Sequence, residues 1–429
     1  MDIFYDSQIQ EILSLFLILF KDWWWLILPL IFYFPLKSLY FWWFNWDIWY
    51  PKIKWILLEI KPPKEILKPF KAMEDIFNVV WSIAYASPIW KEKWCEGQLF
   101  PTSGWFSCEI VSFGGKIHFY LRIQEDWQKR FESVIYSQYP EFEINLVDDY
   151  AKHFPSNIPN KDYDVYDEEY CFISDNPLPI KTYSAFFELE REKAEKGEEK
   201  IDPLHSFLED LSKLKSGEQF CFQINAEPIL EKDYSWQAQG KKIINEITKR
   251  SSSKKPMPIL LEAINILISG PSKPSSKEEI FPPEMILTPG EKEFLKSIEN
   301  KISKPGFKTS IRILYFTKRD AWYNPHCFIA RAYLSHFFSG SQGIITLIRT
   351  RPKIHYFLRD RRVYLRKRRI LKNYLNRFHP QYPHYSGKGV FILNSEELAT
   401  IFHFPSKVIV PGLFYVEAKK GVPPAELPI

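Results

Sequence analysis

The chain has 429 residues, enough for two or three domains, and is 45% hydrophobic and 25% charged. Its net charge of +5 excludes no class of partner, whereas its small number of glycines, 16, argues against glycine-rich phosphate-binding loops. The five cysteines are far apart and form no C-x-x-C pair. This pattern argues against a disulfide framework or a zinc site and favours reduced thiols in a cytoplasmic body.

The first fifty residues are strongly apolar and aromatic. Residues 12–34 are interrupted only by Ser14, Lys21 and Asp22, and this length suits a helix across a bilayer of about 30 Å. Two spans compete: 12–34 encloses Lys21 and Asp22, whereas 23–44 places tryptophans at both membrane interfaces. The predicted interface residues are Trp23, Trp24, Trp25, Trp42, Trp43, Trp46 and Trp49. The alternative is a buried hydrophobic hairpin in a soluble protein.

The flanks of this segment predict its orientation. No basic residue precedes it, and six lysines follow within residues 52–71. Because basic residues stay on the cytoplasmic side, we expect an inner-membrane protein with membrane lipid as a partner and its body in the cytoplasm.

The body shows alternating strand and helix patterns. Residues 106–113 and 116–123 alternate as strands around Gly114-Gly115, which predicts a two-residue hairpin turn. A helix at 125–138 and a strand at 142–147 complete half of a ferredoxin-like sandwich. A strand at 182–189, a helix at 203–214 and a strand at 218–226 are predicted to complete this sandwich, and a further strand–helix–strand copy is predicted in 309–350. The predicted fold class is therefore α+β, with an N-terminal transmembrane helix followed by ferredoxin-like α/β sandwich units and a helical insert.

Five segments follow from these patterns and from the proline-rich and serine-rich linkers. They are a membrane anchor with an interfacial helix (1–60), a ferredoxin-like α+β domain (61–232), a helical section with linkers (233–305), a second α+β unit with a basic helix (306–410) and a proline-rich connector (411–429). Residues 141–170 hold nine acidic side chains and are interpreted as an acidic loop region.

Residues 349–377 hold twelve Lys or Arg side chains against Asp360 alone. A basic amphipathic helix is predicted over 359–378, with Tyr356, Tyr364 and Tyr374 interleaved among the charges. Its predicted apolar side consists of Val363, Ile370, Leu371, Tyr374 and Phe378. Its basic side suits phosphates. Anionic lipid headgroups, the acidic region of a neighbouring copy and simple solvation are the alternatives. The candidate contact residues are Arg361, Arg362, Arg366, Lys367, Arg368 and Arg369.

Motifs for catalysis are absent from the sequence. There is no Walker A loop, G-x-S-x-G, H-E-x-x-H or G-x-G-x-x-G. His379 and His384 lie in a proline-rich stretch without a nearby cysteine, and the neighbours His326 and Cys327 project in different directions from a helix. We therefore expect no catalytic residue, cofactor or metal site, and a non-enzymatic protein.

Several segments together resemble a known bacterial family. They are 55–77, 108–124, 134–144, 147–150, 394–405 and 416–429. These segments are similar to the amino-terminal region of membrane-anchored ATPases of type IV secretion and conjugative DNA transfer from candidate-phylum bacteria. In that family an uncharacterised domain precedes a HerA/FtsK-like P-loop motor.

The sequence departs from this family at its end, because Ile429 lies where the family continues into its Walker motifs. The resemblance therefore implies a non-catalytic, membrane-anchored platform subunit that docks to or precedes a P-loop motor. Its expected partners are that ATPase or other secretion subunits, further copies of this chain and DNA. The alternative is a stand-alone membrane-tethered nucleic-acid-binding protein that uses residues 349–377, and an enzyme with unrecognised chemistry is the third possibility.

Overall fold

A computed structural model defines the architecture of the chain. It describes residues 29, 31–41, 43–63, 66, 69–84, 90–91, 94–95, 105–155, 157–184, 202–229, 235–248, 287–348, 350–351, 354–377, 389–405 and 410–416. The chain forms two compact units, one of Met1–Lys54 with Ala86–Ser103 and the other of Trp55–Tyr85 with Gly104–Ile429.

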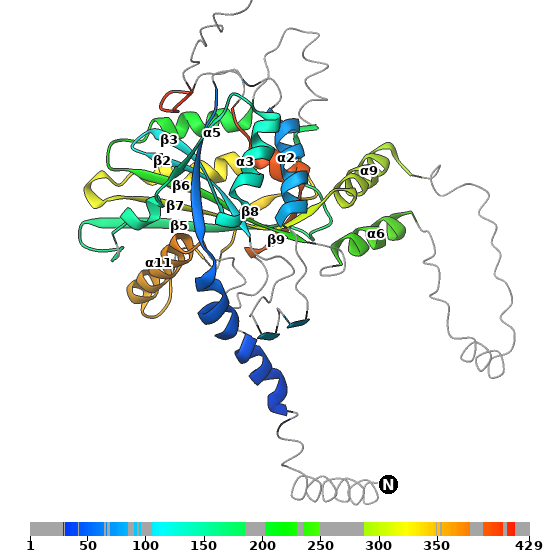
Figure 1. Cartoon of the computed structure of the whole chain (residues 1–429), viewed down its shortest axis with the longest axis horizontal. Helices are drawn as coiled ribbons and strands as arrows, with labels where there is room; N and C mark the ends of the chain where they lie inside the picture. Colours follow the sequence, from blue (N-terminus) through cyan, green and yellow to red (C-terminus); the bar gives the residue numbers. More distant parts are fainter. Residues whose placement is uncertain are drawn as a thin grey trace, which may run out of the picture. The chain divides into compact units, whose positions relative to one another are not determined.

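The second unit is built around one nine-stranded antiparallel sheet with the order β4-β1-β3-β2-β6-β7-β5-β8, in which β9 also pairs with β7 (Figure 1). The strands are β1 Trp55–Lys61, β2 Phe106–Phe113, β3 Lys116–Gln124, β4 Glu143–Val147, β5 Tyr163–Phe172, β6 Gln219–Ile229, β7 Gly306–Lys318, β8 Ile344–Thr346 and β9 Phe391–Asn394. Successive side chains of a strand point to opposite faces, so the sheet buries two separate sets of side chains.

Helices cover the two faces unequally. One face packs against α2 (Pro69–Ala84), α3 (Gln128–Gln138), α5 (Pro203–Ser212), α10 (Ile329–Ser335) and α12 (Ser395–Ile401), and these helices together with the strands form most of the main apolar core. The other face carries α11 (Arg359–Leu375) over a smaller apolar cluster (Figure 1). Short turns of helix are η1 Phe44–Trp49, η2 Tyr50–Lys52, η4 Glu125–Trp127, η5 Tyr150–His153, η6 Arg319–Ala321 and η7 Asn324–Phe328.

The prediction of separate ferredoxin-like units is wrong, because a single large sheet replaces them. Strands β6 and β7 pair along their length, from Gln219 opposite Phe316 to Ile229 opposite Gly306. This pairing joins strands from both predicted α+β segments. The order of elements in the sequence could not reveal it, since pairing between distant strands is decided by tertiary contacts.

The interpretation of 141–170 as an acidic loop is wrong over its last third, where β5 lies near the far edge of the sheet. Asp167, Glu168 and Glu169 are buried in this strand. Three consecutive carboxylates are atypical of a buried strand, so the sequence predicts that these side chains are exposed to solvent. The expected strand at 182–189 is also not observed, because residues 181–184 form no strand and 185–189 lie outside the described residues.

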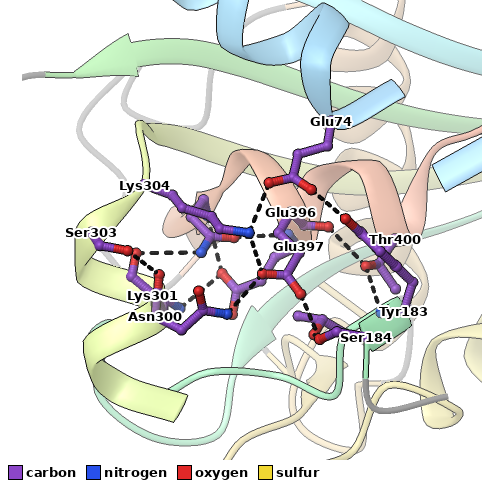
Figure 2. A network of polar contacts seen from close by, with 12 residues as sticks. Glu74, Tyr183, Ser184, Asn300, Lys301, Ser303, Lys304, Glu396, Glu397 and Thr400 are labelled. Carbon is purple, nitrogen blue, oxygen red and sulfur yellow. Dashed lines mark hydrogen bonds and ion pairs between the residues drawn. The ribbon is translucent and has the colours of Figure 1, made fainter. Parts of the chain in front are cut away.

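The helical insert contains α6 (Trp236–Ile247) and α9 (Pro289–Ser303), which pack together through Ile244, Leu295 and Ile298. A capping box at Thr288 begins α9. Figure 2 shows the polar network that joins the end of α9 to α2 and α12. In it Lys304 Nζ lies 2.7 Å from Glu74 and 2.6 Å from Glu396.

The predicted transmembrane helix is contradicted: among the residues that the structure describes, no helix has both the length and the apolar character needed to cross a bilayer. Residues 31–41 are helical and are followed by η1, a π-helix with its own hydrogen-bond pattern. Of the predicted interface tryptophans, Trp43 is exposed. Trp23, Trp24, Trp25 and Trp42 lie outside the described residues, as do the side chains of Trp46 and Trp49.

Candidate nucleic-acid interface

The basic helix α11 occupies nearly the predicted residues and lies against β5 and β7 (Figure 1). Its inward side buries Ile370, Leu371 and Tyr374. Leu371 and Tyr374 pack with Val165 and Leu314 of the sheet, so the 3.6-residue apolar periodicity read from the sequence is the docking side of the helix.

The outward side of α11 carries a basic face, which we define as Arg361, Arg362, Arg368, Arg369 and Lys372. All five side chains are exposed, and the group spans about 16 Å at the rise of a helix. Within the described part of the chain, no carboxylate pairs with Arg361, Arg362, Arg368 or Lys372. The charge of Arg369 acts inward as well, since it opposes the rise in the pKa of Glu169 that burial causes.

Two of the six predicted contact residues face the protein instead. Lys367 is only 13% exposed, and its Nζ lies 2.6 Å from Oδ1 of Asp164. Arg366 donates a hydrogen bond from Nη1 to the carbonyl oxygen of Arg351. The structure therefore leaves Arg361, Arg362, Arg368 and Arg369 of the predicted set exposed, and it adds the exposed Lys372.

Aromatic rings accompany the basic face. The guanidinium of Arg362 lies 5.0 Å from the ring centroid of Tyr356, and that of Arg368 lies 5.6 Å from the ring of Tyr364. Phe357, which the sequence analysis did not single out, is the most exposed of the large hydrophobic side chains in the described regions, at 78%. The signal in the sequence that could have identified Phe357 is its position directly before a basic helix.

A buried ion-pair cluster fixes the end of α11 on the sheet. Arg377 donates from Nε to Oε1 of Glu109 at 2.8 Å and from Nη1 to Oδ2 of Asp149 at 2.7 Å. Tyr150 donates to Glu109 at 2.5 Å, and its hydroxyl is 2.6 Å from that of Tyr374. We call these five residues the Arg377 cluster. They connect α11 to β2 and η5.

The Arg377 cluster places one guanidinium between two carboxylates, those of Glu109 and Asp149. Burial alone would raise the pKa of Glu109, but the charge and hydrogen bonds of Arg377, together with the hydroxyl of Tyr150, hold it below its usual value. Arg377 is buried and has φ +52°, a backbone conformation that is unfavourable for an arginine. Its carbonyl oxygen accepts a hydrogen bond from Trp105 Nε1 at 3.1 Å, so the strained position is held by contacts on both sides.

Asp167 lies on the same sheet face as Val165, under α11. It is fully buried, and neither carboxylate oxygen accepts a hydrogen bond from another residue of the described chain. Burial raises its pKa well above the usual value, and the charge of Lys367 only partly opposes this. This position favours an uncharged Asp167.

Two further polar clusters lie within the described residues. Burial raises the pKa of the Cys327 thiol to about 12, which makes it a poor nucleophile, while the neighbouring His326 contacts Glu218 at 3.1 Å. Burial lowers the pKa of Lys301 and raises that of Glu397, its partner at 3.1 Å (Figure 2). No group of three or more His, Cys, Asp or Glu side chains among the described residues is placed to hold a metal ion.

A cavity of about 500 Å³ lies beside β1 and β4. Its charged lining residues are Arg122, Lys152, Asp148 and Asp149, and Arg122 stacks 4.1 Å above the ring of Trp55. Equal numbers of acidic and basic groups give this cavity no preference for anions, in contrast to the basic face of α11.

No protein-family model matches this sequence, and no curated protein is significantly similar to it. The resemblance to DNA-transfer ATPases therefore supports a proposal about function and not an assignment.

Proposed function

We propose that this chain is a non-catalytic nucleic-acid-binding subunit of a DNA-transfer apparatus, and that the basic face of α11 contacts the phosphate backbone. One observation carries the proposal. Four exposed cations of one helix have no carboxylate partner among the described residues, while the inward-facing Lys367 and the buried Arg377 pair with Asp164 and Glu109 of the sheet. Accessible, unneutralised Lys and Arg side chains on a rigid element are what phosphate binding requires.

The docking of α11 supports this function. A helix with so many cations would repel itself, yet its inward charges are neutralised by Asp164 and its end is fixed by Glu109 and Asp149. The outward charges consequently sit on a helix held at fixed spacing. Such preorganisation reduces the entropy lost when the helix binds a partner.

Contact with an acidic region of a neighbouring copy is less well supported. Asp164, Glu168 and Glu169 of β5 already pair with Lys367, Arg331 and Arg312 of the same chain. Since Asp167 is also buried, β5 offers few free carboxylates to a second copy. A polyanion from outside the chain is the better partner.

The wider role follows from the sequence resemblance. We infer that the protein serves as a platform that holds DNA and docks to or precedes a P-loop motor in a secretion or conjugation apparatus, as one of several copies. Steady ATP hydrolysis by the purified chain at a rate proportional to its concentration would contradict the non-catalytic part of this role.

The phosphate contact is tested by neutralising three members of the basic face, Arg361, Arg368 and Arg369, each to Gln. The matched control replaces Lys241, Lys292 and Lys296 by Gln, because these are exposed lysines of α6 and α9 and the change in net charge is the same. Binding of a labelled oligonucleotide is measured between 50 and 200 mM salt.

The slope of log K against log salt should become shallower by about 2.7 on a duplex probe, or by about 2.1 on a single-stranded probe, when three phosphate contacts are lost. At 50 mM salt the triple arginine variant should bind much more weakly than the control. Equal affinities and equal slopes for the two variants would show that α11 is not the interface. Circular dichroism confirms that each variant retains its helices.

A further inference from the structure

The N-terminal end of α11 presents aromatic rings to the exterior beside its cations. Tyr356 is 58% exposed and Tyr364 is 40% exposed, and Phe357 projects between Tyr356 and the start of the helix. Tyr356 lies against Arg362, and Tyr364 lies against Arg368. The exposed rings therefore adjoin the basic face at two places along it.

The backbone holds Phe357 outward. Ile354 is buried and fixes the segment before the helix, whereas Leu358 adopts φ +56° immediately before Arg359. This left-handed conformation is unfavourable for leucine, and such conformations are concentrated at functional sites. It turns the chain sharply into α11.

A guanidinium group already lies against the ring of Tyr356 and against that of Tyr364. Arg362 lies over Tyr356, and Arg368 lies over Tyr364 and donates to its hydroxyl at 3.3 Å. A planar guanidinium on one side of a ring leaves the opposite side for another flat group. The cations proposed to contact phosphates and the rings able to stack on bases thus lie in the same short segment of the chain.

We infer that this surface selects single-stranded nucleic acid, an inference that rests on the phosphate contact proposed above. In a duplex the faces of the bases are stacked on one another, so Tyr356, Phe357 and Tyr364 would find no partner. In a single strand each base exposes its face, and aromatic side chains stack on it with little regard to sequence. Arg361 and Lys372 then follow the backbone on either side.

The test compares two probes, a 20-nucleotide oligothymidine and a 20-base-pair duplex, at one salt concentration. The variant changes Tyr356, Phe357 and Tyr364 to Leu, which keeps the net charge and the apolar character of the surface. The control makes the same three changes at exposed rings elsewhere, namely Tyr136, Tyr323 and Phe338.

Wild-type protein should bind the single strand more tightly than the duplex. The variant should bind the single strand about 30-fold more weakly, as expected for the loss of two stacked bases, and the duplex as before. The control should resemble wild type.

Equal wild-type affinity for both probes, or an equal loss of both in the variant, would overturn the preference for single strands and leave the phosphate contact standing. Failure of wild type to bind either probe would overturn the proposed function itself, and binding to vesicles rich in anionic lipid would then identify a membrane surface as the partner.

Discussion

Replacing Arg377 by Gln tests how α11 is held on the sheet. Arg377 and Glu109 are fully buried, and the guanidinium contacts both Glu109 and Asp149. The substitution leaves the Glu109 carboxylate in the interior with hydrogen bonds but no counter-charge. Removing one partner of a buried ion pair costs about 3–5 kcal/mol. The free energy of unfolding at pH 7 should fall by this amount.

The dependence on pH gives an independent check. In wild type the pKa of Glu109 lies below its usual 4.5, so the stability from this group is fully present above that pH and is lost as the pH falls through the lowered value. In the variant, burial unopposed by Arg377 raises the pKa of Glu109. Its stability should therefore fall as the pH rises, and the difference from wild type should be largest at neutral pH and small near pH 3.

Urea unfolding followed by circular dichroism measures both effects. The double substitution of Arg377 and Glu109 by Gln should recover part of the loss, because the remaining carboxylate, Asp149, is 25% exposed and no fully buried charge is then left unpaired. The control is Lys213→Gln, whose contact with Glu209 is exposed, and it should unfold like wild type. A loss under 1 kcal/mol at pH 7, or a loss independent of pH, would refute the argument that this pair holds the helix.

Three further predictions concern single positions. Lys301→Met leaves Glu397 buried without its partner, so the free energy of unfolding should fall by about 3 kcal/mol at pH 8. The loss should be smaller at pH 4, because the Glu397 carboxyl then takes up a proton. A loss that urea titration finds equal at both pH values would contradict this. Asp167→Asn removes a carboxyl whose pKa is raised by burial, and this raised pKa makes wild-type stability fall as the pH rises above 3.8. The stability of the variant relative to wild type should therefore increase by up to about 1.4 kcal/mol per pH unit between pH 5 and the raised pKa. Thermal unfolding measures this difference. Gly115→Ala should lower stability by at least about 1–2 kcal/mol, because φ is +86° and the new Cβ would lie 2.6 Å from the carbonyl oxygen of Ser212; an unchanged melting temperature would show that the hairpin can adjust.

The sequence alone determined features that depend on neighbouring residues. Gly114-Gly115 predicted the β2–β3 hairpin, and both glycines have positive φ as a two-residue turn demands. The apolar positions of residues 359–378 predicted both the existence of α11 and the side that it buries, through Ile370, Leu371 and Tyr374. These signals are local, since turn conformation and helical periodicity are set within a few residues.

Tertiary structure alone decided how those elements combine. The joining of β6 to β7, and the burial of the acidic strand β5 under α11, depend on contacts between residues that are at least 77 positions apart. The same holds for the basic helix: composition could not tell that Lys367 turns inward to Asp164 while Arg368 stays exposed, nor that Arg377 would pair with Glu109. A charge is available for binding only when the fold brings no opposite charge to it, and that is a property of the assembled sheet and helix.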